Sequence, residues 1–309
     1  MHSALLPLEW HRPGQTRARR LFAATAGAIL AVALSGCASP VPEAPTCPGD
    51  ATVAQAVSRY AAMQPEPNPP AELSAAGAAC GQAKFVRALA PTHGRVVGWK
   101  AGLTNPVMQK RFGVDEPVRG ALLEKMLLRD GAEVPARFGV RPLLEADLLV
   151  EVGSSALHDA KTPVEVLAAL RSVIPFIELP DINIADPSKI TGPAITWINV
   201  GARLGVTGTP IPVRPDAAFA EALRSMTVRV VDGAGRELDA ARGEVILGHP
   251  LNAVMWLAAD LKRAGIRLRP GDLLSLGSFS KGLPTQPGAS ARVVYEGLPG
   301  NPSVSVRFR

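Results

Sequence analysis

The sequence predicts an α+β fold with a β-rich body. Beyond Pro91 the chain consists of short apolar runs separated by Gly and Pro, which is typical of strands joined by tight turns. Runs with strand character outnumber those with helix character and do not alternate with them regularly, which argues against a doubly wound parallel sheet. With 309 residues, of which 47% are hydrophobic, the chain is long enough to bury a substantial core.

Residues 1–36 are predicted to be a bacterial lipoprotein signal peptide. A basic segment ends at Arg20, about 14 apolar residues follow, and two small residues lead to Cys37. Such an apolar run is too short to cross a hydrocarbon layer of roughly 30 Å as a helix. The pattern resembles a lipobox, so we expect cleavage before Cys37 and lipid attachment to its thiol. Ala38 favours the outer membrane facing the periplasm, with membrane contact through the lipid anchor only.

Cysteine usage agrees with export to the cell envelope. With Cys37 lipidated, Cys47 and Cys80 form an even pair in an oxidising compartment. A bridge between them closes a loop of about 33 residues, which stabilises the fold by roughly 3 to 4 kcal/mol in the chain-entropy description. We expect this disulfide, with two independent thiols as the alternative.

The N-terminal third divides into a tether and a helical region. Residues 37–50 are rich in Pro and small residues, as expected of a tether between an anchor and a folded body. Residues 51–92 are predicted to be helical, with one helix at 51–63, a break at the sequence EPNPP, and a second helix at 71–89. Neither helix carries a constellation of reactive groups, which indicates a scaffolding role.

Residues 93–309 are predicted to form the β-rich domain. Its strands are expected at 95–100, 143–152, 196–204, 226–231, 272–276, 291–295 and 303–308, from their short apolar runs. Helical spacing is expected at 106–112, 163–173 and 252–264. The sequence VDGAG at 231–235 is typical of a hairpin turn.

The strand predicted at 143–152 carries acidic residues inside an aliphatic run. Alternation places Glu145, Asp147 and Glu151 on one face of this strand. Paired carboxylates suit a hard cation such as Mg²⁺ or Mn²⁺ better than zinc, because the segment contains no His or Cys. The alternative is a half-exposed strand whose polar face contacts solvent.

The charge pattern argues against a nucleic-acid partner. The net charge is +6, of which a net three belong to the leader, and the remaining Lys and Arg are scattered. Residues 201–205 lack the pattern of a phosphate-binding glycine loop, and no GxSxG nucleophile motif is present.

Several motifs in order resemble one enzyme family. The chain contains GWKAGLT at 98–104, FGVDEP at 112–117, LLEADLL at 143–149, PFIELPD at 175–181, GHPLNAVMWLA at 248–258 and GDLLSLGS at 271–278. Together they resemble the 2-hydroxypenta-2,4-dienoate hydratases and 2-oxoacid decarboxylases of the fumarylacetoacetate hydrolase superfamily. The resemblance spans roughly residues 50 to 309 and implies that residues 93–309 are the catalytic domain.

The resemblance implies a metal site and a catalytic lysine. The metal ligands fall on Glu145, Asp147 and Glu178, where the second ligand is Asp although many hydratases of the family have Glu. The ammonium group of Lys100 is expected to hold the substrate carboxylate or to stabilise an enolate. His249 stands before a proline at a predicted helix start, which favours capping or packing over a role as general base.

Three further residues are candidates for substrate binding. Asn199 and Ser278 match polar positions of the family near the substrate. Hydratases of the family often carry an acidic residue after GVDEP, whereas this chain has Val118-Arg119-Gly120. The missing acid puts the expected proton transfer in doubt, and Arg119 instead suggests a second carboxylate on the substrate.

The sequence thus predicts a Mg²⁺- or Mn²⁺-dependent hydratase acting on a small 2-hydroxydienoic or 2-oxo acid. Decarboxylation or C–C hydrolysis would pass through the same enolate, so these reactions stay open as alternatives. The envelope location raises a further alternative, a lipoprotein that binds a small molecule without turnover. The oligomeric state is open, and a homo-oligomer is compatible with the sequence.

Overall fold

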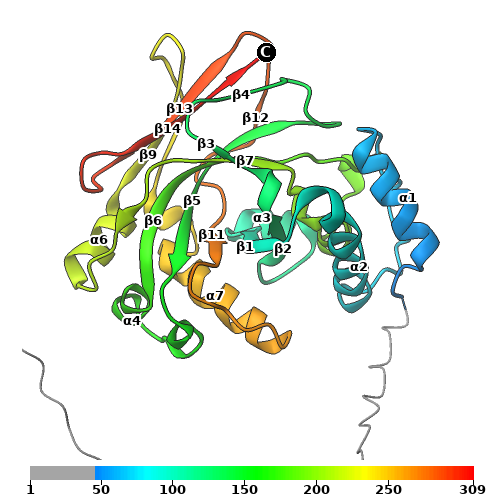
Figure 1. The fold of residues 1–309 in the computed structure, drawn as a ribbon, viewed down its shortest axis with the longest axis horizontal. Helices are drawn as coiled ribbons and strands as arrows, with labels where there is room; N and C mark the ends of the chain where they lie inside the picture. The colour runs from blue at the N-terminus through cyan, green and yellow to red at the C-terminus, as the bar shows by residue number, and fades with distance from the viewer. Residues whose placement is uncertain (1–45) are drawn as a thin grey trace, which may run out of the picture. The chain divides into compact units, whose positions relative to one another are not determined.

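A computed structural model describes residues 46–309 of the chain. The predicted signal peptide, the lipidation site Cys37 and most of the predicted tether lie outside the described residues. Within residues 46–309, the strands form one nine-stranded sheet and one five-stranded sheet, and the helices pack around them (Figure 1). The predicted α+β class is therefore confirmed.

The strands of the larger sheet follow the order β2-β1-β11-β5-β6-β7-β3, with β12 added beside β5 and β8 beside β6. Their bounds are β2 (Val118–Leu123), β1 (Val96–Gly102), β11 (Leu273–Ser275), β5 (Leu143–Val152), β6 (Leu170–Leu179), β7 (Leu204–Thr207), β3 (Leu127–Arg129), β12 (Leu283–Pro284) and β8 (Ile211–Pro212). The smaller sheet has the order β10 (Glu237–Arg242), β9 (Thr227–Asp232), β13 (Ser290–Glu296), β14 (Ser303–Phe308) and β4 (Ala132–Val134). Strands β9 and β10 form the hairpin predicted around residues 231–235.

Seven α-helices are present among the described residues. They are α1 (Asp50–Ala61), α2 (Ala75–His93), α3 (Pro106–Phe112), α4 (Pro163–Ala168), α5 (Gly192–Trp197), α6 (Ala217–Ser225) and α7 (Pro250–Arg263). Short 3-10 helices lie at Glu124–Met126, Ser155–Asp159, Pro187–Lys189, Asn199–Gly201 and Gly243–Val245. No helix of the described part of the chain is both long and apolar enough to span a membrane.

Strands β5 and β6 run antiparallel through the centre of the larger sheet (Figure 1). Both are almost entirely buried. One face packs on the smaller sheet and on α4 and α7 within one hydrophobic core, and the other face carries Leu149, Ile174 and Phe176, which form a separate cluster with Leu122. Pro175 lies inside β6, where the neighbour of the strand changes from β8 at Val173 to β7 at Phe176. Its missing N–H therefore costs no ladder hydrogen bond in this central strand.

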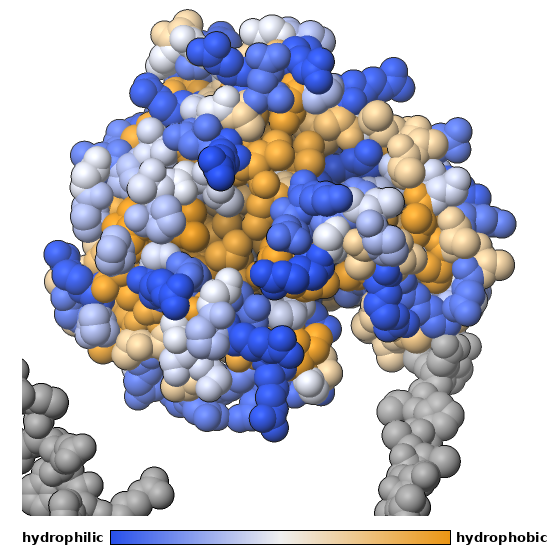
Figure 2. Space-filling view, in the orientation of Figure 1, coloured by the Kyte–Doolittle hydropathy of each residue, from blue (hydrophilic) through white to orange (hydrophobic). Residues whose placement is uncertain are grey.

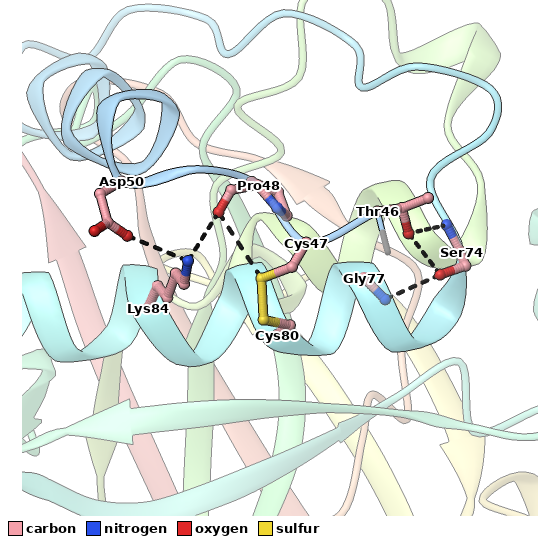
Figure 3. Close-up of a disulfide and its surroundings, with 8 residues drawn as sticks. All are labelled: Thr46, Cys47, Pro48, Asp50, Ser74, Gly77, Cys80 and Lys84. Atoms are coloured by element: carbon pink, nitrogen blue, oxygen red, sulfur yellow. Dashed lines mark hydrogen bonds and ion pairs between the residues drawn. A yellow bond between two sulfur atoms is a disulfide. The ribbon is translucent and has the colours of Figure 1, made fainter. Parts of the chain in front are cut away.

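A second core joins the N-terminal helices to the larger sheet. Helices α1 and α2 pack with α5 against β2, through side chains that include Phe85 and Trp197. Cys47 and Cys80 form a disulfide that fastens the segment before α1 to α2 (Figure 3). Beside it, Ser74 caps α2 by accepting a hydrogen bond from the Gly77 N–H (Figure 3). The helices at 51–92 thus share their core with the β-rich part.

The face shown in the space-filling view carries apolar side chains in its middle and hydrophilic ones around them (Figure 2).

Two predicted elements differ from the structure. The strand expected at 196–204 is replaced by α5 and the 3-10 helix Asn199–Gly201, because Thr191 caps a helix start with a proline in its first turn. The helix expected at 163–173 ends at Ala168, and Leu170 already begins β6. The β-branched residues of β6 pack in the sheet. The helical spacing of the residues before them led to the prediction of a longer helix.

Candidate active site

The three predicted metal ligands lie on neighbouring strands at the centre of the larger sheet. Glu145 of β5 is the direct cross-strand partner of Glu178 of β6, and Asp147 is the partner of Phe176. Directly opposite residues of an antiparallel pair share a face, with Cβ atoms about 5 Å apart. The register therefore places the three carboxylates on one face, while Glu151 further along β5 pairs with Arg171 at the surface.

Asp147 is fully buried and is held by several donors. Its Oδ2 accepts a hydrogen bond from the Ser275 hydroxyl at 2.5 Å. Its Oδ1 accepts the backbone N–H groups of Leu276 and Gly277, each at 3.1 Å, where the chain leaves β11. Gly277 has a φ of +100°, and an added Cβ would collide with Thr104. Only glycine fits this turn, which wraps the end of β11 around the carboxylate.

Lys100 enters the same site from β1. It is buried, and its Nζ forms an ion pair with Glu178 and donates a hydrogen bond to the Val200 carbonyl at 3.0 Å. A Cβ at Gly120 of β2 would lie 2.8 Å from Lys100 Cγ, so the glycine makes room for the lysine stem. The structure thus brings Lys100, Glu145, Asp147 and Glu178 together.

Two carboxylates of the site, Glu145 and Asp147, resist ionisation. Burial raises the pKa of Glu145 to about 8, and the Glu178 charge adds to the rise while Lys100 opposes it. Burial and the Glu178 charge likewise raise the pKa of Asp147 to about 7, against the hydrogen bond from Ser275. One lysine does not compensate three acids at such short range, so the site favours additional positive charge.

The donor set fits a hard divalent cation. Within residues 46–309, no three His, Cys, Asp or Glu side chains are gathered closely enough to hold a metal ion. In this arrangement Lys100 engages Glu178, and Ser275 engages Asp147. The chemistry of the set nevertheless matches Mg²⁺ or Mn²⁺, because three carboxylates supply hard oxygen atoms and lack compensating charge. A bound cation would share Glu178 with Lys100.

Asn199 supports the site through hydrogen bonds to the backbone. Its side-chain amide exchanges two hydrogen bonds with the backbone of Ala121 in β2, at 2.8 and 2.9 Å, and Gln82 Nε2 also donates to its Oδ1. Asn199 and Val200 both have positive φ values, 55° and 54°. This strained turn aims the Val200 carbonyl at Lys100, and such strain is typical of functional sites. Asn199 was predicted to bind substrate, but its amide is already occupied by the backbone.

Ser278 and Arg119 have different surroundings from those expected of substrate ligands. Ser278 Oγ donates to the Ser280 carbonyl at 2.6 Å and shapes the turn beside β5. Arg119 is the cross-strand partner of Ala101, so it lies on the face opposite Lys100 and forms an ion pair with Asp260 of α7. The structure does not bring Arg119 to the carboxylates, which removes the basis for expecting a second substrate carboxylate there.

His249 caps α7, as the sequence suggested. Its Nδ1 accepts the Leu251 N–H at 3.0 Å, and its Nε2 lies 3.1 Å from the Ala220 carbonyl. Both ring nitrogens are thus engaged by the backbone, away from the carboxylates.

Comparisons with known proteins identify the family. No protein-family model matches the chain. The chain is 33% identical over 194 residues to 2-keto-4-pentenoate hydratase of Paraburkholderia xenovorans, covering 63% of this chain and 70% of that protein. This chain belongs to the 2-keto-4-pentenoate hydratase family. The hydratase-family chain is also 30% identical to 2-oxo-hept-4-ene-1,7-dioate hydratase of Escherichia coli, over 74% of this chain and 84% of that enzyme.

Solved structures share the fold of this hydratase-family chain. 4-Oxalocrotonate decarboxylase from Pseudomonas putida G7, in a complex with magnesium and adipate, superposes with a TM-score of 0.74 at 24% identity. Its complex with calcium and acetate superposes with a TM-score of 0.72 at 25% identity. Each match covers 84% of this chain and 96% of the decarboxylase chain.

Tyr295 is a residue of this hydratase-family site that sequence reasoning missed. It comes from β13 of the smaller sheet and is fully buried. Its hydroxyl bonds to the Asp147 carbonyl, accepts the Phe176 N–H at 3.0 Å and lies 3.0 Å from the Phe176 carbonyl. It therefore joins β5 to β6 at the residue pair that carries Asp147. Only the packing of the two sheets reveals this contact.

Proposed function

We propose that this protein is a divalent-metal-dependent hydratase of a small 2-hydroxy-2,4-dienoate. The observation that carries the proposal is the convergence of the buried Lys100, Asp147 and Glu178 with the partly buried Glu145, in a member of the 2-keto-4-pentenoate hydratase family. The expected product is a 4-hydroxy-2-oxo acid, formed when water adds to C4 of the 2-oxo-3-enoate tautomer.

Glu145, Asp147 and Glu178 would hold Mg²⁺ or Mn²⁺. Such an ion would supply Lewis-acid stabilisation of negative charge on the substrate. A relative of the same fold binds calcium together with a carboxylate, acetate, which supports a hard cation. The orientation of the Asp147 carboxylate is set by the protein itself, because it accepts hydrogen bonds from the Ser275 hydroxyl and from three backbone N–H groups.

The protein itself contributes charge, orientation and exclusion of water. The Lys100 ammonium group lies among the carboxylates. There it can interact with the substrate carboxylate or with the negative charge that develops on the enolate. Its position is fixed by the Val200 carbonyl and by the space that Gly120 leaves for its stem. Burial lowers the local dielectric, which strengthens these electrostatic interactions relative to water.

The test combines metal binding with product analysis. Mature protein stripped of metal should regain turnover of 2-hydroxypenta-2,4-dienoate on addition of Mg²⁺ or Mn²⁺, and Glu178→Gln should abolish both the turnover and the tight binding of Mn²⁺. Release of CO₂ from an oxalocrotonate-type substrate, without hydration, would assign the decarboxylase reaction instead. If the protein binds metal and substrate but forms no product, the proposed enzymatic activity is refuted, and the protein is a lipoprotein that binds a small molecule without turnover.

We further propose that the mature protein is anchored in the cell envelope at Cys37, on the periplasmic side of the outer membrane. The lipobox-like sequence before Cys37 supports this location, and so does the disulfide between Cys47 and Cys80, since such bonds persist in oxidising compartments. Mass spectrometry of the membrane fraction should find a diacylglyceryl-modified N-terminal Cys37. Recovery of an unprocessed, soluble chain from cells, or no change with Cys37→Ala, would contradict it.

A further inference from the structure

A cavity of about 570 Å³ lies away from the carboxylate cluster, and three segments line it. The first is the start of β1, from Arg95 to Trp99, and the second follows α7, from Gly265 to Arg267. The third, Arg269–Asp272, leads into β11. Since β1 and β11 are parallel neighbours, the cavity lies at their amino ends, whereas Lys100 and Ser275 lie toward their carboxyl ends.

The charge of this cavity is strongly one-sided. Its lining includes Arg95, Arg267 and Arg269, which are all exposed. Among residues 46–309, none of these three guanidinium groups has an ion-pair or hydrogen-bond partner. The acid of the lining, Asp272, already accepts the Arg269 backbone N–H at 2.7 Å through its Oδ2. Three arginines and a single aspartate, whose carboxylate is partly engaged, therefore line one hollow.

Neighbouring arginines show that unpaired guanidinium groups are not the rule in this region. Arg119 and Arg263, which lie beside the last turns of α7, both form ion pairs with Asp260. The three arginines of the cavity are instead exposed, and within residues 46–309 their donors have no partner, so these donors are available to a ligand. Arginine binds carboxylate and phosphate oxygens in a bidentate manner, so clustered guanidinium groups favour a ligand with several such oxygens.

We propose that this cavity, the arginine pocket (Arg95, Arg267, Arg269 and Trp99), binds a small molecule bearing at least two anionic oxygen groups. The cavity is large enough for such a ligand, and Trp99 supplies an apolar wall against which the carbon skeleton of an organic anion can pack. The site is separate from the carboxylate cluster, since it lies at the amino ends of β1 and β11. The proposal does not depend on the proposed hydratase activity.

Calorimetric titration of the mature protein at low ionic strength tests the arginine pocket. The probes are pyrophosphate and tricarballylate, with acetate as the monovalent comparison. We expect both multivalent anions to bind, acetate to bind much more weakly, and the affinity to fall as salt is added. The double variant Arg267→Gln/Arg269→Gln should lose about 100-fold in affinity, since two charge-assisted hydrogen bonds to the anion are lost and each contributes about a factor of ten.

A matched control removes the same charge elsewhere. Arg292 and Arg307 are exposed on the smaller sheet, and within the described residues neither has an ion-pair partner. Arg292→Gln/Arg307→Gln should bind the anions as the wild type does, which separates a site from an effect of net charge. The proposal is overturned if both double variants lose affinity equally or if no multivalent anion binds. Loss of binding in Lys100→Met would also overturn it, by placing the anion at the active site.

Discussion

The two ends of β1 use positive charge in opposite ways. Toward the carboxyl end, Lys100 is buried and bonded to Glu178 and the Val200 carbonyl. At the amino end, Arg95 is exposed and, within the described chain, has no partner for its guanidinium group. Helix α7 links the two ends, because Leu247 just before it bonds to the Thr104 carbonyl and Gly265 just after it lines the arginine pocket.

This contrast shows what burial does to a charged group. A buried ammonium group needs hydrogen-bond or ion-pair partners, and these partners hold it in one position. An exposed guanidinium needs no partner and keeps its donors available for a ligand. The buried end is therefore suited to chemistry on a bound substrate, and the exposed end is suited to reversible binding of an anion.

The largest effect is expected from exchanging Lys100, compared with Arg119 on the other face of the same strand pair. Lys100→Met should lower kcat/KM by about 10³-fold, in the range for loss of a group that stabilises developing charge. It should not weaken Mn²⁺ binding, because the variant frees Glu178 from its ion pair. Arg119→Met should change kcat/KM by less than about threefold, since partly exposed ion pairs contribute little. If both variants lose kcat/KM equally in steady-state kinetics, the placement of Lys100 in the site and of Arg119 on the opposite face is refuted.

A smaller effect is expected at Tyr295, for which the other tyrosine of the chain is the control. Tyr295→Phe removes the hydroxyl that joins β5 to β6 beside Asp147 and should weaken Mn²⁺ binding by about 10-fold, as is typical when the support of a metal ligand is lost. Tyr60→Phe removes a single long hydrogen bond of 3.5 Å to the Ala202 carbonyl and should leave the affinity unchanged.

Unfolding in urea completes the tyrosine comparison. If Tyr295→Phe lowers the free energy of unfolding but leaves the Mn²⁺ affinity unchanged, the hydroxyl supports the fold alone and does not position Asp147.

Sequence reasoning succeeded where a pattern is local and failed where packing decides. Strand β5 was predicted with its observed bounds, Leu143–Val152, because alternating acids inside an aliphatic run identify a strand. Glu178 was placed in the site by its motif, but its strand was not foreseen, because β6 is buried on both faces and shows no alternation. Arg119 was assigned to the substrate because its cross-strand partner, which decides its face, is not visible in the sequence.

Two features of the molecule had no sequence signal at all. Tyr295 and Asp147 are 148 residues apart and meet only because the smaller sheet packs on β5. The arginine pocket likewise combines residues near position 95 with residues near 270, which are brought together by the parallel pairing of β1 and β11. Long-range pairings of this kind follow from topology rather than from local composition.

The smallest predicted effect concerns His249, at the α7 end that lies near Thr104. Burial lowers the pKa of His249, and its Nδ1 must stay unprotonated to accept the Leu251 N–H. The contribution of the imidazole to stability is therefore complete above the ordinary pKa of about 6.5 and declines as the pH falls below it, because the unfolded chain takes up the proton first. The asparagine variant His249→Asn can still cap the helix and does not titrate.

The comparison of wild type with His249→Asn isolates this titration from the other ionisable groups. At pH 7.5 the wild type should be more stable by up to about 1 kcal/mol, since it also keeps the hydrogen bond to Ala220. At pH 5.5 the difference in the free energy of urea unfolding should shrink or reverse. If the free energy of unfolding of the two proteins depends on pH in the same way, His249 has the same protonation state in the folded and unfolded chain. The cap of α7 would then not respond to pH.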